Sequence, residues 1–376
     1  MAPVVLAAML CGCASYDDPY YVHSVWRPAD ASSATADVLY LTDRHGDPNF
    51  PGGFDYQRGG AASCGVVHAV VPPARLSGDP AIFARETGRE AISCGAAQDG
   101  LASAIARSAR QKNCNSVLVF VHGFDTGFET AALRAAQLGS DTQWSCAVAA
   151  FSWSSSGQRD HYAEDRERST EAEPLFAKFL RALAASGLRT EIVAHSLGTR
   201  LVLDALASPG NGGSAPLADR VIFAAADIGT AEDNHAFSAL YRTAAPRFHR
   251  LTIYASHEDA ALAIAQRLNH GIARLGYEPG AAMRDGAQNI DVIDASDAPG
   301  DLLGHNYFGL SHEMLADMSL VLADVPAKAR LESRANEVPT LMHGENGPSY
   351  RLNVAPDRAP DWLTRFIRWL VTAFAG

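Results

Sequence analysis

One serine of the chain lies between a short apolar run and a helical pattern. Residues 190–195 predict a buried strand, and the apolar spacing of residues 197–208 predicts a helix. Ser196 would then occupy a sharp strand-to-helix turn, which holds its hydroxyl out of the sheet and beside the helix N-terminus. Two backbones pass close together in such a turn, so its flanking positions must be small. Gly198 meets that need, and so does Ala194, where glycine is usual. Ser196 is therefore the candidate nucleophile of a serine hydrolase.

A serine that takes up an acyl group needs two hydrogen-bond donors for the oxyanion. One is expected to be the backbone N–H of Leu197, directly after the serine. The other usually comes from the loop after an earlier strand, and residues 116–121 predict such a strand, buried on both faces. The N–H of Phe124 in the following loop is the expected second donor. His122 in the same loop is interpreted as a structural histidine.

The acid of a catalytic triad follows the serine in the chain order that the α/β-hydrolase fold uses. Two predicted strands after the serine lead to carboxylates, the first to Asp227 and the second to Glu258 and Asp259. The acid most often follows the strand two after the nucleophile. This selects Asp259 and leaves Asp227 and Glu258 as alternatives.

The base is expected in a loop after the last predicted strand, which begins at Ile290. His305 lies there and is the candidate general base, which would take the Ser196 proton and return it to the leaving group. His312 is the rival. It follows Ser311, a predicted N-cap, so a surface position on a helix is its simpler interpretation.

The elements around these residues alternate between strand and helix patterns. This alternation indicates an α/β fold with a mainly parallel, twisted sheet flanked by helices. Residues 46–60, rich in Gly, Pro and Asp, predict a loop. Pro174 predicts the first turn of a helix, so residues 154–173 are expected to be a polar connection, either plain or lid-like.

Taken together, these features resemble a bacterial α/β-hydrolase family of the esterase/lipase superfamily whose members largely lack an assigned substrate. The resemblance covers about residues 38–325 and rests on Thr42-Asp43-Arg44, His122-Gly123-Phe124, Phe151-Ser152-Trp153-Ser154, Ala194-His195-Ser196-Leu197-Gly198, Tyr254-Ala255-Ser256 with Asp259, Asp291-Val292-Ile293-Asp294, and Gly304-His305 with Tyr307-Phe308. It implies the α/β-hydrolase fold and a Ser196–Asp259–His305 triad. It implies no particular substrate.

The first residues of the chain predict a targeting signal. Residues 4–10 are apolar but too few to span a bilayer, and they lead into Leu10-Cys11-Gly12-Cys13, which resembles a bacterial lipobox. We expect residues 1–12 to be a lipoprotein signal peptide, Cys13 to carry lipid, and residues 13–35 to be a tether, although no Lys or Arg precedes the apolar run. The anchor would place the protein in the bacterial cell envelope, on the outer membrane facing the periplasm.

Such a compartment oxidises thiols, and four cysteines follow Cys13. Cys114 and Cys146 each precede a predicted strand, and the two strands are neighbours in this fold. A Cys114–Cys146 disulfide is therefore a hypothesis, with Cys64 and Cys94 as the remaining pair.

The 376 residues can form one large hydrolase domain, expected over residues 36–330, with a C-terminal extension over residues 331–376. The extension ends in an amphipathic helix. Its apolar residues are Trp362, Leu363, Phe366, Leu370 and Phe374, with Arg365 and Arg368 beside them. Packing on the domain is the simpler interpretation of this helix, and a position on a lipid surface is the alternative.

The sequence thus predicts a serine hydrolase of small-molecule or lipid carboxylic esters that needs no metal or organic cofactor. A net charge of −11 without a basic run argues against a nucleic-acid partner, and no Cys/His cluster has metal-ligand spacing. A thioesterase, acyltransferase or peptidase would use the same triad. A non-catalytic envelope lipoprotein with this fold as a binding module is the alternative from another class, and the sequence indicates no protein partner.

Overall fold

The structure is a computed structural model. It describes residues 33–72, 84–96, 98–209, 215–230, 236–280, 289–331, 340–344, 350–356 and 358–374. The predicted signal peptide, Cys13 and nearly all of the predicted tether lie outside the described residues.

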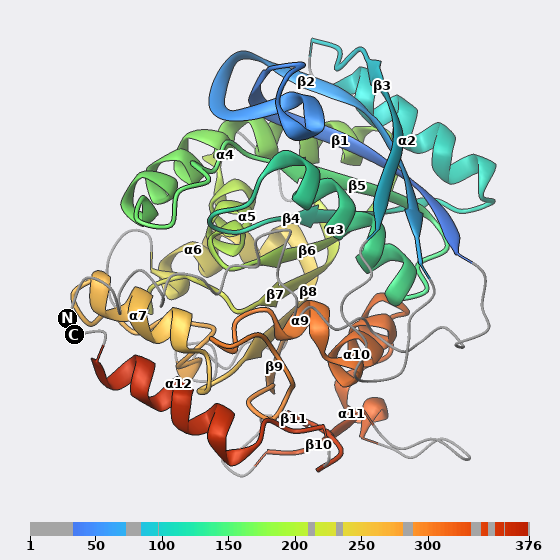
Figure 1. Cartoon of the computed structure of the whole chain (residues 1–376). Coiled ribbons are helices and arrows are strands. Elements are labelled where there is room, and N and C mark those ends of the chain that lie inside the picture. The colour runs from blue at the N-terminus through green and yellow to red at the C-terminus, as the bar shows by residue number, and fades with distance from the viewer. Residues whose placement is uncertain are drawn as a thin grey trace.

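The described strands form one sheet in the order β10-β11-β9-β8-β7-β6-β4-β5-β1-β2-β3 (Figure 1). The strands are β1 (Ala34–Gly46), β2 (Phe54–Val71), β3 (Arg85–Ile92), β4 (Ser116–Val121), β5 (Ala147–Ser152), β6 (Arg189–His195), β7 (Ala218–Ala224), β8 (Phe248–Ala255), β9 (Ile290–Asp294), β10 (Leu341–His343) and β11 (Tyr350–Leu352). Pairing is parallel from β1 through β5, β4, β6, β7, β8 and β9 to β11, whereas β2, β3 and β10 pair antiparallel. The carboxyl ends of the central strands therefore meet at one edge of the sheet.

Helices cover both faces of this sheet (Figure 1). They are α2 (Asp99–Gln111), α3 (Phe128–Asp141), α4 (Tyr162–Ala185), α5 (Leu197–Ala207), α6 (Phe237–Ala244), α7 (Ala260–Leu268), α9 (Tyr307–Leu310), α10 (His312–Leu322), α11 (Ala327–Arg330) and α12 (Trp362–Phe374), with short 3₁₀ turns η2 (Pro51–Gly53) and η4 (Ala245–Arg247). Strand β4 shows why two layers form. Val117 and Val119 belong to the core shared with α2, α4, α5 and α6, and Leu118 and Phe120 to the core on the side of α3 and α10. Since alternate side chains point to opposite faces, a strand covered on both sides must be apolar throughout.

The predicted loop over residues 46–60 is shorter in the structure. Strand β2 begins at Phe54, and its first residues pair with the end of β1. Phe54 is buried, and its ring lies 4.5 Å from that of Phe128 and 5.8 Å from that of Tyr40. This packing extends the hairpin through a stretch whose composition favours a loop.

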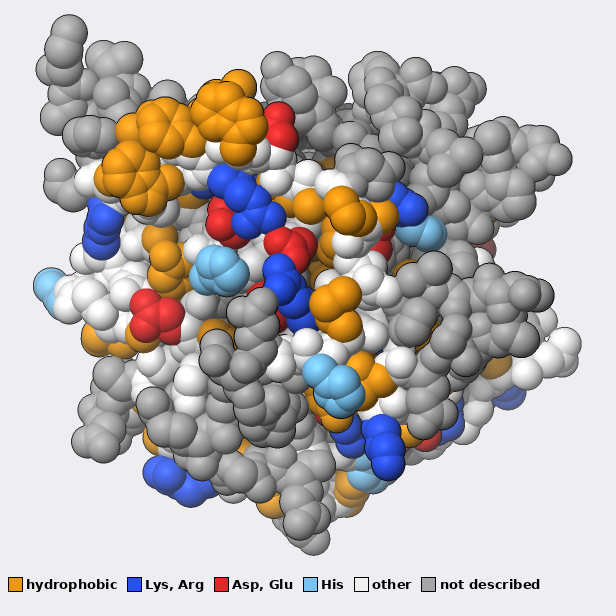
Figure 2. Space-filling view, turned by 90° about the horizontal axis from the view of Figure 1, so that it is seen from below, with side chains coloured by type: hydrophobic (Ala, Val, Ile, Leu, Met, Phe, Trp, Pro, Cys, Tyr) orange, Lys and Arg blue, Asp and Glu red, His pale blue; other side chains and the backbone are white. Residues whose placement is uncertain are grey.

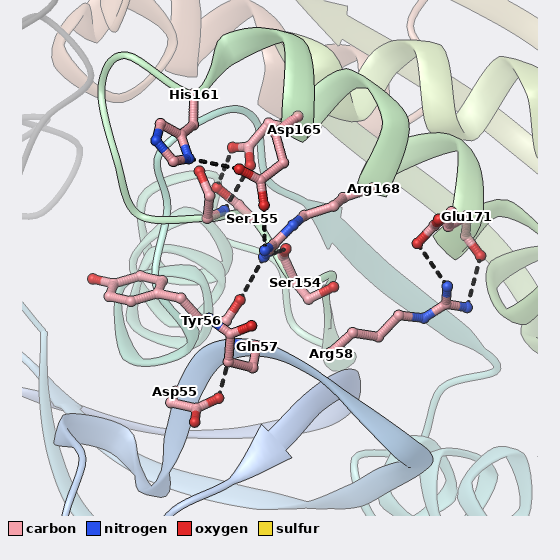
Figure 3. A network of polar contacts seen from close by, with 12 residues as sticks. Asp55, Tyr56, Gln57, Arg58, Ser154, Ser155, His161, Asp165, Arg168 and Glu171 are labelled. Carbon is pink, nitrogen blue, oxygen red and sulfur yellow. Dashed lines mark hydrogen bonds and ion pairs between the residues drawn. The ribbon is translucent and has the colours of Figure 1, made fainter.

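The expectation that a helix starts near Pro174 is wrong, because α4 starts at Tyr162 and carries Pro174 in its interior. Side chains on its first turns hold this part of the helix against other elements (Figure 3). Arg168 donates to the carbonyls of Tyr56 and Ser154, and Glu171 accepts from Arg58 at 2.7 Å. Tertiary hydrogen bonds thus offset the helix bond that proline cannot donate.

Strand β11, which belongs to the predicted C-terminal extension, is part of the sheet, because it pairs in parallel with β9. Helix α12 lies beside α7 (Figure 1). Arg368 is buried, whereas Trp362 and Trp369 are 77% and 60% exposed, and Leu363 and Phe366 are also exposed. Figure 2, which views the molecule from the side of α12, shows hydrophobic side chains gathered on part of this surface. The structure does not describe the side chain of Phe374.

All four cysteines of the described residues form disulfides, in the two predicted pairs. Cys114–Cys146 joins the starts of β4 and β5 with a Cα–Cα distance of 5.9 Å. Cys64–Cys94 ties β2 to the segment before α2 at 5.3 Å. Among the described helices, none has the length and apolar character that crossing a membrane requires.

Candidate active site

Ser196 lies at the turn between β6 and α5 with φ 51° and ψ −124°. A non-glycine residue at positive φ is strained and persists only where the surroundings enforce it. They do so here. The N–H of Ser196 donates to the carbonyl of Ala224 at 3.1 Å, and its carbonyl accepts from the N–H groups of Thr199 and Asp227 at 3.0 and 3.3 Å. The turn predicted from the sequence is thus held between α5 and the end of β7.

Two glycines let the loop after β4 lie against this turn. A Cβ on Gly123 would lie 2.7 Å from the Cβ of Ser196, and a Cβ on Gly198 would lie 2.4 Å from the carbonyl oxygen of His122. Neither position has room for a larger side chain. This close approach places the backbone that carries Phe124 beside the nucleophile.

The two expected oxyanion donors are available. Within the described part of the chain, the backbone N–H groups of Phe124 and Leu197 have no protein acceptor. Phe124 lines a cavity together with Ser196, and Leu197 is the first residue of α5, whose N-terminus favours negative charge. An oxyanion formed on a carbonyl bound to Ser196 would therefore meet unsatisfied donors.

Polar contacts hold the loop that carries Phe124. Arg44 donates to the carbonyl of Thr126 at 2.6 Å, and Asp165 of α4 accepts from the N–H of Asp125 at 3.3 Å. Figure 3 shows Asp165 directed at Ser155, whose hydroxyl donates to it at 2.6 Å. The first turns of α4, which were expected to be a connection, thus position the loop of the expected oxyanion donor Phe124.

The structure buries His122, which the sequence interprets as a structural histidine. Its Nδ1 lies 2.8 Å from the carbonyl oxygen of Gly123 and its Nε2 3.2 Å from that of Trp153, on whose ring it stacks. Burial and, to a lesser extent, the positive charge of Arg44 lower the pKa of His122 to about 3, so the ring is neutral. Ser152 lies 3.5 Å from its Nε2, but Ser152 is fully buried and is no part of the cavity at Ser196. The Ser152–His122 pair is therefore inaccessible to a substrate.

His305 and Asp259 are brought together although 46 residues separate them. Nδ1 of His305 lies 2.8 Å from Oδ2 of Asp259, and both side chains are buried. The other carboxylate oxygen, Oδ1, accepts from the N–H of Leu262 at 3.0 Å and caps α7. Burial lowers the pKa of His305, but the negative charges of Asp259, Asp301 and Asp227 outweigh it and raise that pKa above 6.5.

The rival residues have other partners. Asp227 accepts from the hydroxyl of Tyr162 at 2.7 Å, and its other oxygen lies 3.2 Å from Nε of Arg274. Glu258 pairs with Arg365 at 3.1 Å. His312 starts α10 and does not line the cavity that contains Ser196.

The cavity joins the predicted nucleophile and base. The empty space of the cavity, together with its open mouth, is about 480 Å³. Ser196, His305, Phe124, Tyr162 and Asp227 lie along one part of its wall, and α7 supplies an apolar part that ends at Leu268. Among the described residues, no group of His, Cys, Asp or Glu could hold a metal ion.

Three residues near the site escaped the sequence reasoning. Asp301 accepts from the N–H of His305 at 2.8 Å and from the Asn306 amide at 2.9 Å. The ring of His195 lies 4.7 Å from that of His305, and burial keeps it neutral by lowering its pKa well below 6.5. Tyr162 reaches the cavity from the start of α4. The local signals were the position of Asp301, four residues before the predicted base, and that of His195, directly before the predicted nucleophile.

Comparison with known proteins identifies the family of the chain. Residues 97–323 match the profile of a family described as alpha/beta hydrolase of unknown function (DUF900), and the chain belongs to this family. No curated protein matches it. The predicted α/β-hydrolase fold is thereby confirmed, and Ser196, Asp259 and His305 all lie within the matched residues.

Solved structures that resemble the chain include several esterases. A hyperthermophilic esterase from the archaeon Pyrobaculum calidifontis is 10% identical, with 87% of this chain and 88% of that chain covered at a TM-score of 0.38. A Pyrococcus furiosus esterase is 10% identical, and the match covers 83% of this chain and 97% of that chain at a TM-score of 0.38. Carboxyl esterase 2 from the fungus Tuber melanosporum is 11% identical, and the match covers 86% of this chain and 96% of that chain at a TM-score of 0.37. Similarity this low carries no information about substrate.

Proposed function

We propose that this alpha/beta hydrolase cleaves carboxylic esters through an acyl-enzyme on Ser196. One observation carries the proposal. Ser196, on its strained turn, and His305, hydrogen-bonded to a buried Asp259, line the same cavity next to two unsatisfied backbone N–H groups. A nucleophile, a base, an acid that orients the base, and an oxyanion site form the set that acyl transfer requires.

In the proposed reaction, Oγ of Ser196 attacks the ester carbonyl carbon while Nε2 of His305 takes the hydroxyl proton. Asp259 keeps the remaining proton on Nδ1 and stabilises the imidazolium. The N–H groups of Phe124 and Leu197 bind the oxyanion of the tetrahedral intermediate. When that intermediate collapses, the C–O bond to the alcohol breaks and the alkoxide takes the proton from His305. Water, deprotonated by His305, then attacks the acyl-enzyme carbonyl carbon; as the C–O bond to Ser196 breaks, His305 returns the proton to Oγ, which releases the acid and restores Ser196.

The cavity wall suggests the kind of ester. The α7 side chains that line it are Ala261, Leu262, Ile264, Ala265 and Leu268. They favour an apolar acyl or alcohol group, because burying such a group against them removes apolar surface from water. A thioester would react by the same steps, so substrate comparison must separate the two activities.

The test is a series of p-nitrophenyl esters of increasing acyl length, with the matching thioesters, assayed with wild type and Ser196→Ala. We expect ester turnover that Ser196→Ala abolishes, and a higher kcat/KM for esters than for thioesters. Turnover that survives Ser196→Ala would reject the proposed nucleophile. A preference for the thioesters would make the protein a thioesterase.

We also propose that the protein is anchored by lipid on Cys13 in the bacterial envelope. Two disulfides support an oxidising compartment, where they persist. The exposed aromatic face of α12, formed by Trp362, Phe366 and Trp369, would then contact the same lipid surface, because tryptophan favours the headgroup region. Flotation of non-acylated protein with liposomes tests this contact. Equal flotation of wild type and of a variant with both tryptophans changed to alanine would reject it.

A further inference from the structure

The loop that presents His305 contacts the C-terminal helix. Three backbone groups of this loop form hydrogen bonds with other backbone groups. The N–H of Gly304 donates to the carbonyl of Asp301 at 2.9 Å, and the carbonyl of Leu303 accepts from the N–H of Ala260 at 2.8 Å. Ala260 directly follows Asp259, so the loop of the base and the turn of the acid form one unit.

Arg368 of α12 contacts the loop that leads to His305. Its side chain is buried, with 3% of the residue exposed. Nη2 donates to the carbonyl of Asp301 at 2.8 Å and Nε to that of Leu302 at 3.4 Å. The guanidinium therefore binds two consecutive carbonyls of the turn that leads to His305, in the fixed geometry that distinguishes arginine from lysine.

Gly304 shows how closely these parts fit. A Cβ at this position would lie 2.7 Å from the carbonyl oxygen of Glu258 and 2.8 Å from Cζ of Arg368. Gly304 also has φ +68°, which favours glycine. The residue before the base thus lies between the turn of the acid and the guanidinium, so a change at Arg368 has a direct route to His305.

The cation also acts on the charges near the base. His305 faces Asp259 from the acid turn, Asp301 from its own loop, Asp227 from the end of β7, and the neutral His195 from β6. Burial lowers the pKa of Arg368, and the charges of Asp301, Glu258 and Asp259 oppose that effect. Arg368 thus offsets part of the negative charge around the acid and the base.

We propose that Arg368 is a positioning residue for the active site, which holds the 301–304 turn so that His305 is aligned between Asp259 and Ser196. This inference rests on the proposed function. It assigns a role to a helix that lies outside the residues matched by the family profile, which end at 323. Part of the active site of this chain is therefore supported from its C-terminal extension.

The test compares three variants with wild type in the full chain. Arg368→Met keeps the length of the side chain but loses its charge and donors, and Arg368→Lys keeps the charge. Arg365→Met is the matched control. Arg365 lies one turn earlier on α12 and donates to Glu258 and Asp297. Within the described part of the chain, it makes no hydrogen bond to the 301–304 turn. Active-site titration corrects each kcat for the folded, competent fraction.

We expect Arg368→Met to lower kcat about 10²-fold, the size of effect that a misplacement near 1 Å can have, with little change in KM. Loss of the cation should also move the acid limb of kcat/KM to higher pH. Arg368→Lys should keep the acid limb of kcat/KM at the wild-type pH and recover part of kcat. Arg365→Met should leave kcat and the pH of the acid limb unchanged. A purely structural role would lower only the competent fraction, so a wild-type kcat and limb in Arg368→Met would overturn the proposal.

Histidine-selective NMR titration of His305 separates this proposal from the proposed function. A higher pKa of His305 in Arg368→Met supports the role of Arg368 even if the wild type hydrolyses no ester. If the enzyme is active, an unchanged pKa of His305 together with unchanged kinetics in Arg368→Met would overturn the proposal. If the wild type hydrolyses no ester, an unchanged pKa of His305 alone would overturn it.

Discussion

Replacing Asp259 by asparagine should nearly abolish activity while leaving the fold in place. Oδ1 of Asp259 caps α7 through Leu262, and asparagine caps helices about as well as aspartate. Oδ2 accepts the proton of His305 Nδ1 at 2.8 Å. An amide nitrogen in that place would donate to Nδ1 instead, which moves the ring proton to Nε2. The base would then face Ser196 with a proton and could not accept another.

The expected magnitude follows from this change of tautomer. Loss of the orienting carboxylate lowers kcat about 10⁴-fold in serine hydrolases, or about 5.4 kcal/mol at 1.36 kcal/mol per decade. Stability should fall by no more than about 1 kcal/mol, the net value of one hydrogen bond, because the amide replaces the bond to Nδ1 and neutral His305 leaves no unpaired buried charge.

The assay is steady-state ester hydrolysis and a urea melt of wild type, Asp259→Asn and Asp227→Asn. Asp227 is the matched control, because its carboxylate lines the cavity but binds Tyr162 and Arg274. A kcat for Asp259→Asn within about 10-fold of wild type would refute the reasoning, and a larger loss in Asp227→Asn would transfer the role of the acid to that residue.

Three further outcomes follow from the same geometry. The acid limb of kcat/KM should lie above pH 6.5, because the raised pKa keeps His305 protonated and unable to act as a base until the pH exceeds it; a limb well below 6.5 in the pH profile would contradict this. Gly123→Ala should cost about 1–3 kcal/mol of stability and most of the activity, since its Cβ would lie 2.7 Å from that of Ser196; melting and turnover near wild type would contradict the close approach. Reduction of Cys64–Cys94 and Cys114–Cys146, which close loops of 30 and 32 residues, should lower the free energy of unfolding by about 3–4 kcal/mol for each disulfide, and a denaturant midpoint unchanged by dithiothreitol would contradict this.

The features of the site that arise locally could be predicted from the sequence. The turn at Ser196 is specified by a strand, a helix and the small residues Ala194 and Gly198 next to one another in the chain. The choice of Asp259 over Asp227 used the strand that the acid most often follows in this fold, the second after the nucleophile, and the structure gives Asp259 the hydrogen bond to His305. Its catalytic role remains a prediction.

What the sequence could not give depends on contacts between distant segments. Pro174 predicts the start of a helix, but side-chain bonds from Arg168 hold the helix for several turns before it. The apolar residues of α12 suggest a buried face, yet the structure buries Arg368 against the His305 loop and exposes the tryptophans. Propensity and periodicity describe one element at a time, so neither could detect these partners.

The central claim is that Ser196 is the activated nucleophile. The most direct measurement is fluorophosphonate labelling of wild type, His305→Ala and Ser152→Ala, with the modified peptide identified by mass spectrometry. The account predicts one adduct, on Ser196, which is lost in His305→Ala and retained in Ser152→Ala. An adduct on Ser152, or no adduct on well-folded wild type, would contradict it.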